Sequence, residues 1–196
     1  MCVRLARSLV CVVVLFGLAG FPVGWPCEAA QLDSDSTDQT AAGTEIPERL
    51  DAIIESIPSI PAETKLRRNL AHATFCLPQN LLGILLYGLL QAAGDVLDTR
   101  EMNEMTIVVT GTPLGASLGR YIFVPASFLT EAAVRHEYGH TMQSYKRGPF
   151  FLLFEGAASF IQAVIATVSP SFANGYFDRW PENEASQLGG ASAGDF

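Results

Sequence analysis

The 196-residue sequence predicts an α+β fold that is mostly helical, with a small antiparallel hairpin or sheet packed on one helix. Apolar residues in 46–57 recur with the spacing of one helical face. Residues 105–110 and 117–124 have the composition of strands, and the segment GTPLGAS between them has the chemistry of a turn. We therefore expect these two strands to form a hairpin, with helices before and after it in the chain.

The overall composition limits the classes of protein to which the chain can belong. Apolar residues make up 49% of the sequence and charged residues 16%, which allows one buried core. The formal net charge is -8, and the sequence contains no basic run. Because phosphate contacts need clustered Lys and Arg, we expect no nucleic-acid partner.

The first 29 residues have the features of a signal peptide. Arg4 and Arg7 precede the apolar run SLVCVVVLFGLAG, and the small residues of CEAAQ allow cleavage after Ala29 or Ala30. We therefore expect an exported protein, periplasmic or secreted, with an uncleaved N-terminal membrane anchor as the alternative. Cleavage would remove the other three cysteines and leave Cys76 alone, so no internal disulfide is expected.

The rest of the chain divides into one domain and two short flanking segments. We predict a disordered linker over 30–45, a domain over 46–190 and a disordered tail over 191–196. The segments 78–93 and 150–168 are so apolar that contact with a membrane surface is an alternative to burial. Helices are expected over 46–57, 62–75, 78–93, 127–146 and 150–168, with a short last helix near Pro181.

The segment RHEYGH, residues 135–140, contains the candidate metal-binding residues. His136 and His140 are four residues apart, so they project from nearly the same side of a helix and can share one Zn²⁺. Glu137 is well placed to contact a water molecule at the metal and to take its proton. A pair of structural histidines without metal is the alternative. The motif uses two of the chain's three histidines within a credible helix, which favours zinc.

A catalytic zinc needs a third protein ligand and an open position. Glu155 lies in an apolar segment, where a carboxylate needs a partner, so it could bind the metal or orient a ligand histidine. The residue types alone leave four candidates for the third ligand: His72, Glu155, Glu182 and Glu184.

The run RHEYGHTMQSYKRGPFFLLFEGAASF and the later FDRWPENEASQLGG resemble the gluzincin-type zinc metallopeptidases, in particular small bacterial HEYGH proteins. The resemblance covers about 105–190 and implies a minimal gluzincin-like core. It also implies that Glu182 is the third ligand, because the family's downstream pattern E-x-x-x-D begins there. Ser186 departs from that pattern, since an acidic or amide residue normally stands in its place and supports a ligand histidine.

The same resemblance implies two further roles. The strand 117–124 would bind an extended substrate by backbone pairing, with an ordinary packed strand as the alternative. Tyr176 would help to hold the oxyanion, with a structural tyrosine as the alternative.

Together these features favour an exported zinc-dependent hydrolase, a metallopeptidase acting on a peptide or protein substrate. One alternative is a non-catalytic, zinc-stabilised envelope module that binds a partner. Another is a membrane-embedded metalloprotease. The charged residues Arg135, Lys146 and Arg147 flank the motif and favour a soluble or membrane-surface domain over an embedded one.

Overall fold

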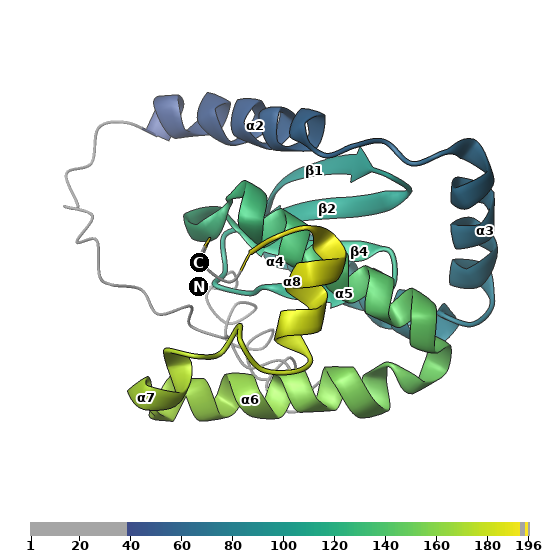
Figure 1. Ribbon diagram of the computed structural model, residues 1–196. Coiled ribbons are helices and arrows are strands. Elements are labelled where there is room, and N and C mark those ends of the chain that lie inside the picture. The colour runs from purple at the N-terminus through teal and green to yellow at the C-terminus, as the bar shows by residue number, and fades with distance from the viewer. Residues whose placement is uncertain (1–38, 193–194, 196) are drawn as a thin grey trace.

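A mixed four-stranded sheet lies at the centre of the computed structural model, which describes residues 39–192 and 195 (Figure 1). Hydrogen-bonded strands follow the order β1-β2-β4-β3. Helices make up most of the remaining described chain, so the predicted α+β, mostly helical class is confirmed. The predicted signal peptide and the first part of the predicted linker lie outside the described residues.

The first two strands form an antiparallel hairpin, β1 (Val96–Met102) and β2 (Met105–Thr110). The turn residues Asn103 and Glu104 have φ values of 50° and 70°, the left-handed conformation that a two-residue hairpin turn requires. The strand predicted over 105–110 is confirmed, and all six of its residues are buried. β1 was not predicted, because the charged and polar residues of VLDTREM obscure the strand pattern.

The predicted hairpin between 105–110 and 117–124 is wrong. The second segment is divided into β3 (Ala116–Leu118) and β4 (Tyr121–Pro125), which pair with each other antiparallel. β4 then pairs with β2 in parallel, with Thr106 opposite Tyr121. The sheet is therefore mixed, where the sequence predicted an antiparallel one.

A tertiary contact explains the division of that segment. Gly119, with φ of 63°, turns the chain between β3 and β4, and a Cβ on it would lie 2.0 Å from Oδ1 of Asn80. The same Asn80 oxygen accepts a hydrogen bond of 2.7 Å from the backbone N–H of Arg120. Because Asn80 lies some 40 residues earlier in the chain, local sequence could not reveal this turn.

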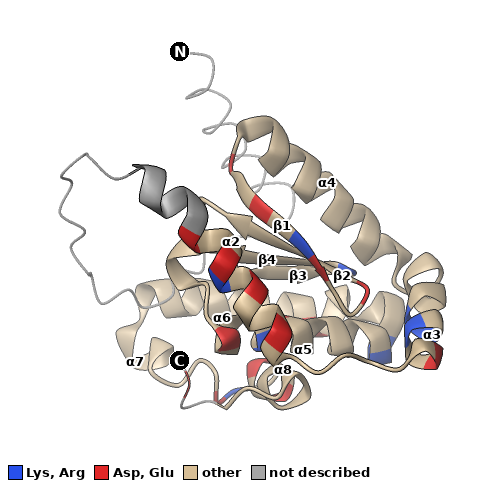
Figure 2. Ribbon diagram, turned by 90° about the horizontal axis from the view of Figure 1, so that it is seen from above, with Lys and Arg blue, Asp and Glu red and all other residues tan. Residues whose placement is uncertain are grey.

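Two helices cover opposite faces of the sheet, α4 (Leu77–Ala93) on one and α5 (Glu131–Arg147) on the other (Figure 2). Leu86 and Leu90 of α4 pack on Val108 and Phe123 of the sheet. On the other face, α5 and the helix α2 (Gln39–Ser56) pack against alternate residues of β2 and β4. The sheet is thus buried on both faces, which fixes the position of α5.

Several helices differ from their predicted bounds, by seven residues at the start of α2. α2 begins at Gln39, inside the segment predicted as a linker, and Pro47 lies inside the helix. Thr130 caps the N-terminus of α5, since its Oγ1 accepts a hydrogen bond of 3.1 Å from the amide of Ala133. Ala191 is buried, so the chain is still packed at the first residue of the predicted tail. The other elements are α3 (Ala62–Ala73), η1 (Ala126–Phe128), η2 (Gly148–Phe150), η3 (Leu152–Gly156, a π-helix), α6 (Ala157–Val168), α7 (Pro170–Ala173) and α8 (Glu182–Gly189).

α4 and α6 contain no charged residue and leave part of their apolar surface exposed. Within the described chain, no single helix is long and apolar enough to span a membrane. Two strongly bent pairs of consecutive helices satisfy the length and composition together, with bends of 83° and 111°.

Candidate metal centre

The candidate site lies where α5 and α8 pack against each other (Figure 1). Gly139 on α5 is so close to α8 that a Cβ on it would lie 1.8 Å from the carbonyl oxygen of Ala185. A Cβ on Gly189 of α8 would lie 1.7 Å from the carbonyl oxygen of Arg135. Glycine at both positions lets the two backbones touch, which brings the side chains of α8 to the histidines of α5.

Three side chains from these helices converge: His136, His140 and Glu182. The Nε2 atoms of His136 and His140 lie 3.0 and 3.2 Å from the same carboxylate oxygen, Oε2 of Glu182. The side chains are 2%, 10% and 1% exposed, respectively. The structure therefore brings together the two histidines of the motif and the glutamate that the resemblance implied.

A different polar side chain contacts Nδ1 of each histidine, on the side of the ring away from Glu182. Nδ1 of His136 lies 2.9 Å from Oγ of Ser186, and Nδ1 of His140 lies 2.8 Å from Oε1 of Gln143. Both oxygens can accept a hydrogen bond, so each Nδ1 can carry the ring hydrogen and leave its Nε2 with a free lone pair. Ser186 thus contacts a histidine of the motif from the position at which the gluzincin-type pattern has an acidic or amide residue.

This arrangement is suited to a cation. Two nitrogen lone pairs and a carboxylate oxygen that face one another repel, and a divalent metal ion between them removes the repulsion for all three. The second carboxylate oxygen of Glu182, Oε1, is buried without a hydrogen-bond partner among the described residues. A cation bound by this carboxylate would compensate that atom as well. The donor set of two imidazoles and one carboxylate therefore fits a metal such as zinc.

The pKa values follow the same charge pattern. Burial alone would lower the pKa of His140, but attraction by Glu182 and Glu137 and its hydrogen bonds raise it to about 9. Burial alone would raise the pKa of Glu182, but without a metal the charge of His140 and hydrogen bonds donated by Nε2–H of both imidazoles hold it well below its ordinary value. The site therefore favours a negative carboxylate beside a positive charge, whether a proton or a metal provides it.

Glu137 lies beside the cluster and is buried, with 5% of its surface exposed. Its Oε2 accepts a hydrogen bond of 2.7 Å from Oγ of Ser117, which also lies 2.7 Å from the backbone oxygen of Glu137. Ser117 belongs to β3, the strand at one edge of the sheet. The edge strand thus orients the carboxylate that the motif predicts as general base.

Tyr176 lies near the same cluster, in the loop between α7 and α8. Burial and then the charge of Glu182 raise the pKa of its hydroxyl far above the ordinary value, with a smaller contribution from Glu137. The hydroxyl therefore stays protonated and can donate a hydrogen bond. Its neighbour Phe177 packs edge-on against His136, with ring centroids 5.1 Å apart.

The other candidates for the third ligand lie elsewhere. His72 of α3 packs near Tyr145, with both ring nitrogens buried and without a partner among the described residues. Glu155 and Glu184 both pair with Arg147. Among the described residues, Glu182 is therefore the one candidate of the four that lies beside His136 and His140.

Sequence reasoning did not assign roles to Ser117, Gln143 or Phe177. Gln143 follows His140 by three residues, so helical spacing places it on the same face, and this signal could have found it. Ser117 and Phe177 reach the site from other elements, and no local pattern marks them.

Comparisons with protein-family models, curated proteins and solved structures find no match to this chain. The class of protein is therefore defined by the fold and the site, a mostly helical α+β protein with a buried His-His-Glu cluster.

Proposed function

We propose that this protein is an exported zinc-dependent hydrolase, specifically a metallopeptidase, that holds its zinc ion through His136, His140 and Glu182. The observation that carries the proposal is the convergence of two imidazole nitrogens on one buried carboxylate oxygen. Each imidazole also has its own partner on the opposite nitrogen, an arrangement typical of metal-ligating histidines. Zinc is the metal that this mixed nitrogen and oxygen donor set most often binds in hydrolases.

When bound, zinc supplies Lewis acidity, which acidifies water and polarises a carbonyl group. Glu137 takes the proton of the attacking water and passes it to the leaving amine. The hydrogen bond from Ser117 orients the Glu137 carboxylate for this transfer. The hydroxyl of Tyr176, kept protonated by its raised pKa, donates to the carbonyl oxygen as negative charge develops there.

The edge strand β3 is the proposed place for the peptide backbone. The sequence hypothesis assigned this role to 117–124 as a whole, but β4 lies inside the sheet and β3 lies at its edge. An extended peptide could pair with the side of β3 that no described strand occupies, next to the residue that orients Glu137.

The test is metal analysis of the purified full-length protein beside His136→Ala and Glu182→Gln. We expect about one zinc per chain in the unaltered protein and a loss of zinc in both variants. His72→Ala and Glu131→Gln are matched controls, because each removes the same type of group outside the cluster. Unaltered protein that neither contains nor takes up zinc would overturn the proposal.

A non-catalytic zinc module is the second candidate, and the burial of the three ligands favours it. Structural zinc sites are closed, whereas catalytic sites keep one position open to water or substrate. The two candidates differ in their response to Glu137→Gln. A hydrolase loses turnover and keeps its zinc, whereas a structural module keeps both its zinc and its cellular role.

Peripheral contact with a membrane surface is a further part of the proposal, supported by α4. Leu81, Ile84 and Leu85 lie on this helix, which has no charged residue, and each is 52–57% exposed. Sedimentation with lipid vesicles tests the contact. We expect the full-length protein to sediment with vesicles and the double variant L81Q/L85Q to sediment less. Equal sedimentation of the two proteins would rule out this surface.

A further inference from the structure

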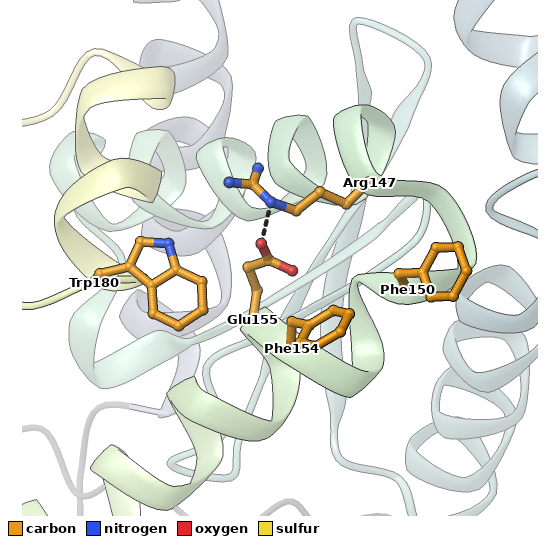
Figure 3. Close-up of a pocket in the computed structure, with 5 residues that line it drawn as sticks. All are labelled: Arg147, Phe150, Phe154, Glu155 and Trp180. Carbon is orange, nitrogen blue, oxygen red and sulfur yellow. Dashed lines mark ion pairs between the residues drawn. The ribbon is translucent and has the colours of Figure 1, made fainter.

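A pocket of about 480 Å³ lies beyond the C-terminal end of the metal-binding segment of α5 (Figure 3). It is lined by Arg147, Phe150, Phe154, Glu155 and Trp180. The three aromatic side chains are 50–61% exposed, whereas Glu155 is 1% exposed. Exposed aromatic rings and a buried carboxylate thus line the same pocket, and the proposed metal centre uses none of them.

The charged groups of the pocket differ in how fully they are bonded. Nε of Arg147 pairs with Oε1 of Glu155, and Nη2 of Arg147 lies 3.1 and 2.9 Å from the two carboxylate oxygens of Glu184. Oε2 of Glu155 is buried and has no hydrogen-bond partner among the described residues. The guanidinium of Arg147 therefore already has two carboxylate partners. Oε2 of Glu155, a carboxylate oxygen, is the atom in the pocket that still lacks a hydrogen-bond donor among the described residues.

The position of Glu155 in the chain adds to this picture. It lies in η3, a single stretch of π-helix between η2 and α6. Such stretches are rare within helices and often occur at functional sites. In Figure 3 the carboxylate faces Arg147, with Trp180 on one side and Phe154 on the other.

These groups together define the chemistry of a ligand. An acceptor with a negative charge bonds best to a charged N–H donor, and the faces of Trp and Phe attract cations. Apolar walls also favour an aliphatic stem behind the charge. The side chains of Lys and Arg have both features.

We propose that this pocket binds a basic side chain, Lys or Arg, of a peptide ligand. The assignment of that peptide as the substrate rests on the proposed function. Trp180 lies two residues before the ligand Glu182, and Arg147 lies seven residues after His140, or about 10 Å along the helix. In an extended peptide this distance corresponds to about three residues from the cleaved bond.

The test measures binding directly, so that it does not depend on turnover. The probes are short N-acetylated, C-amidated peptides of Ala and Gly that carry one Lys, norleucine or Glu, with the special residue moved through each position. Binding is followed by the fluorescence of Trp180 in full-length protein carrying Trp25→Phe and the silencing substitution Glu137→Gln. We expect the best lysine peptide to bind about tenfold more tightly than its norleucine counterpart.

Two variants assign this preference to the pocket. Glu155→Gln keeps an oxygen for Arg147 but removes the charge, and we expect it to abolish the preference for Lys without changing metal content. Glu131→Gln makes the same change of charge at the other end of α5, where Glu131 pairs with Arg135, and should leave the preference intact. If Glu155→Gln does not fold, Trp180→Leu takes its place, because the side chain of Trp180 is exposed. Binding to this variant is measured by calorimetry, and we expect a weaker preference for Lys.

The outcomes separate this proposal from the proposed hydrolysis. Equal binding of lysine and norleucine peptides, or a lysine preference that survives both pocket substitutions, overturns the pocket proposal even if zinc and peptidase activity are found. A lysine preference that Glu155→Gln or Trp180→Leu removes, in a protein that cleaves no peptide, supports the pocket and overturns only the assignment of the peptide as substrate.

Discussion

The buried histidines near the two ends of α5 have opposite surroundings. The end that contains the candidate metal centre is the metal end. There His136 and His140 each have a partner on both ring nitrogens. At the C-terminal end, both nitrogens of His72, beside Tyr145, and Oε2 of Glu155 have no partner among the described residues. All ring nitrogens of the first histidine pair thus have partners, whereas those of His72 have none among the described residues, and each end also contains one buried glutamate oxygen without a partner there.

The pKa values of two buried histidines express this difference. That of His140 is raised to about 9, because the attraction of Glu182 and Glu137 outweighs burial. That of His72 is lowered to about 4, because burial is reinforced by the positive charges of Arg120 and Arg68. Burial alone therefore does not predict whether a histidine is charged. The sign of the neighbouring charges decides it.

The largest expected effect follows from the proposed function and concerns Glu137, the proposed general base. Glu137→Gln removes the charge that accepts a proton but keeps an oxygen for the hydrogen bond from Ser117. We expect peptide hydrolysis to fall by about 10²–10⁴-fold, with unchanged zinc content. Rates and metal content are measured on the same preparations, with Glu131→Gln as the control. Loss of zinc from Glu137→Gln would instead make Glu137 a ligand.

The next effect tests the helix contact that assembles the metal end. A Cβ at Gly139 would collide with the backbone of Ala185, so Gly139→Ala should lower the free energy of unfolding by about 3 kcal/mol or more. Gly88 of α4 has open space where a Cβ would go, and Gly88→Ala should stabilise by about 0.5–1 kcal/mol. Urea denaturation measures both. A neutral Gly139→Ala would show that the two helices can separate freely.

Acid titration tests the opposite end. Because the pKa of His72 is about 4 when folded and 6.5 ordinarily, the unfolded chain binds an extra proton between these values. Stability from neutral His72 is therefore fully present above pH 6.5 and is lost as the pH falls toward 4, by about 3 kcal/mol in all. Urea denaturation across this range measures the loss. His72→Gln should make the profile flatter, and an unchanged profile would contradict the assignment.

The smallest expected effect concerns the residue that connects the two ends. Gln143 bonds to His140 through Oε1, and its Nε2 lies 3.2 Å from Oε2 of Glu184, the partner of Arg147. Gln143→Ala should weaken zinc binding about 10–100-fold. Competition with a zinc chelator measures the affinity, and Gln187→Ala, which removes a side-chain contact within α8, is the matched control. Equal affinities would mean that His140 needs no support from this side.

Several parts of the fold were predictable because their signals are local. Spacing of apolar residues indicated the helices, and the β-branched run MTIVVT indicated β2. The order of the strands was not predictable, because Asn80 of α4 fixes the turn at Gly119. The parallel pairing of β4 with β2, in place of the expected hairpin, likewise joins segments that no local pattern connects.

The sequence by itself determined the pair His136 and His140 and the position of Glu137 beside them, because one helical turn sets their spacing. Tertiary structure decided the rest of the site. Glu182 meets the histidines across 42–46 residues of chain, and Ser117 meets Glu137 across 20. These contacts depend on the close packing of α5 with α8 and on the edge position of β3, and packing between distant segments leaves no periodic signal in the sequence.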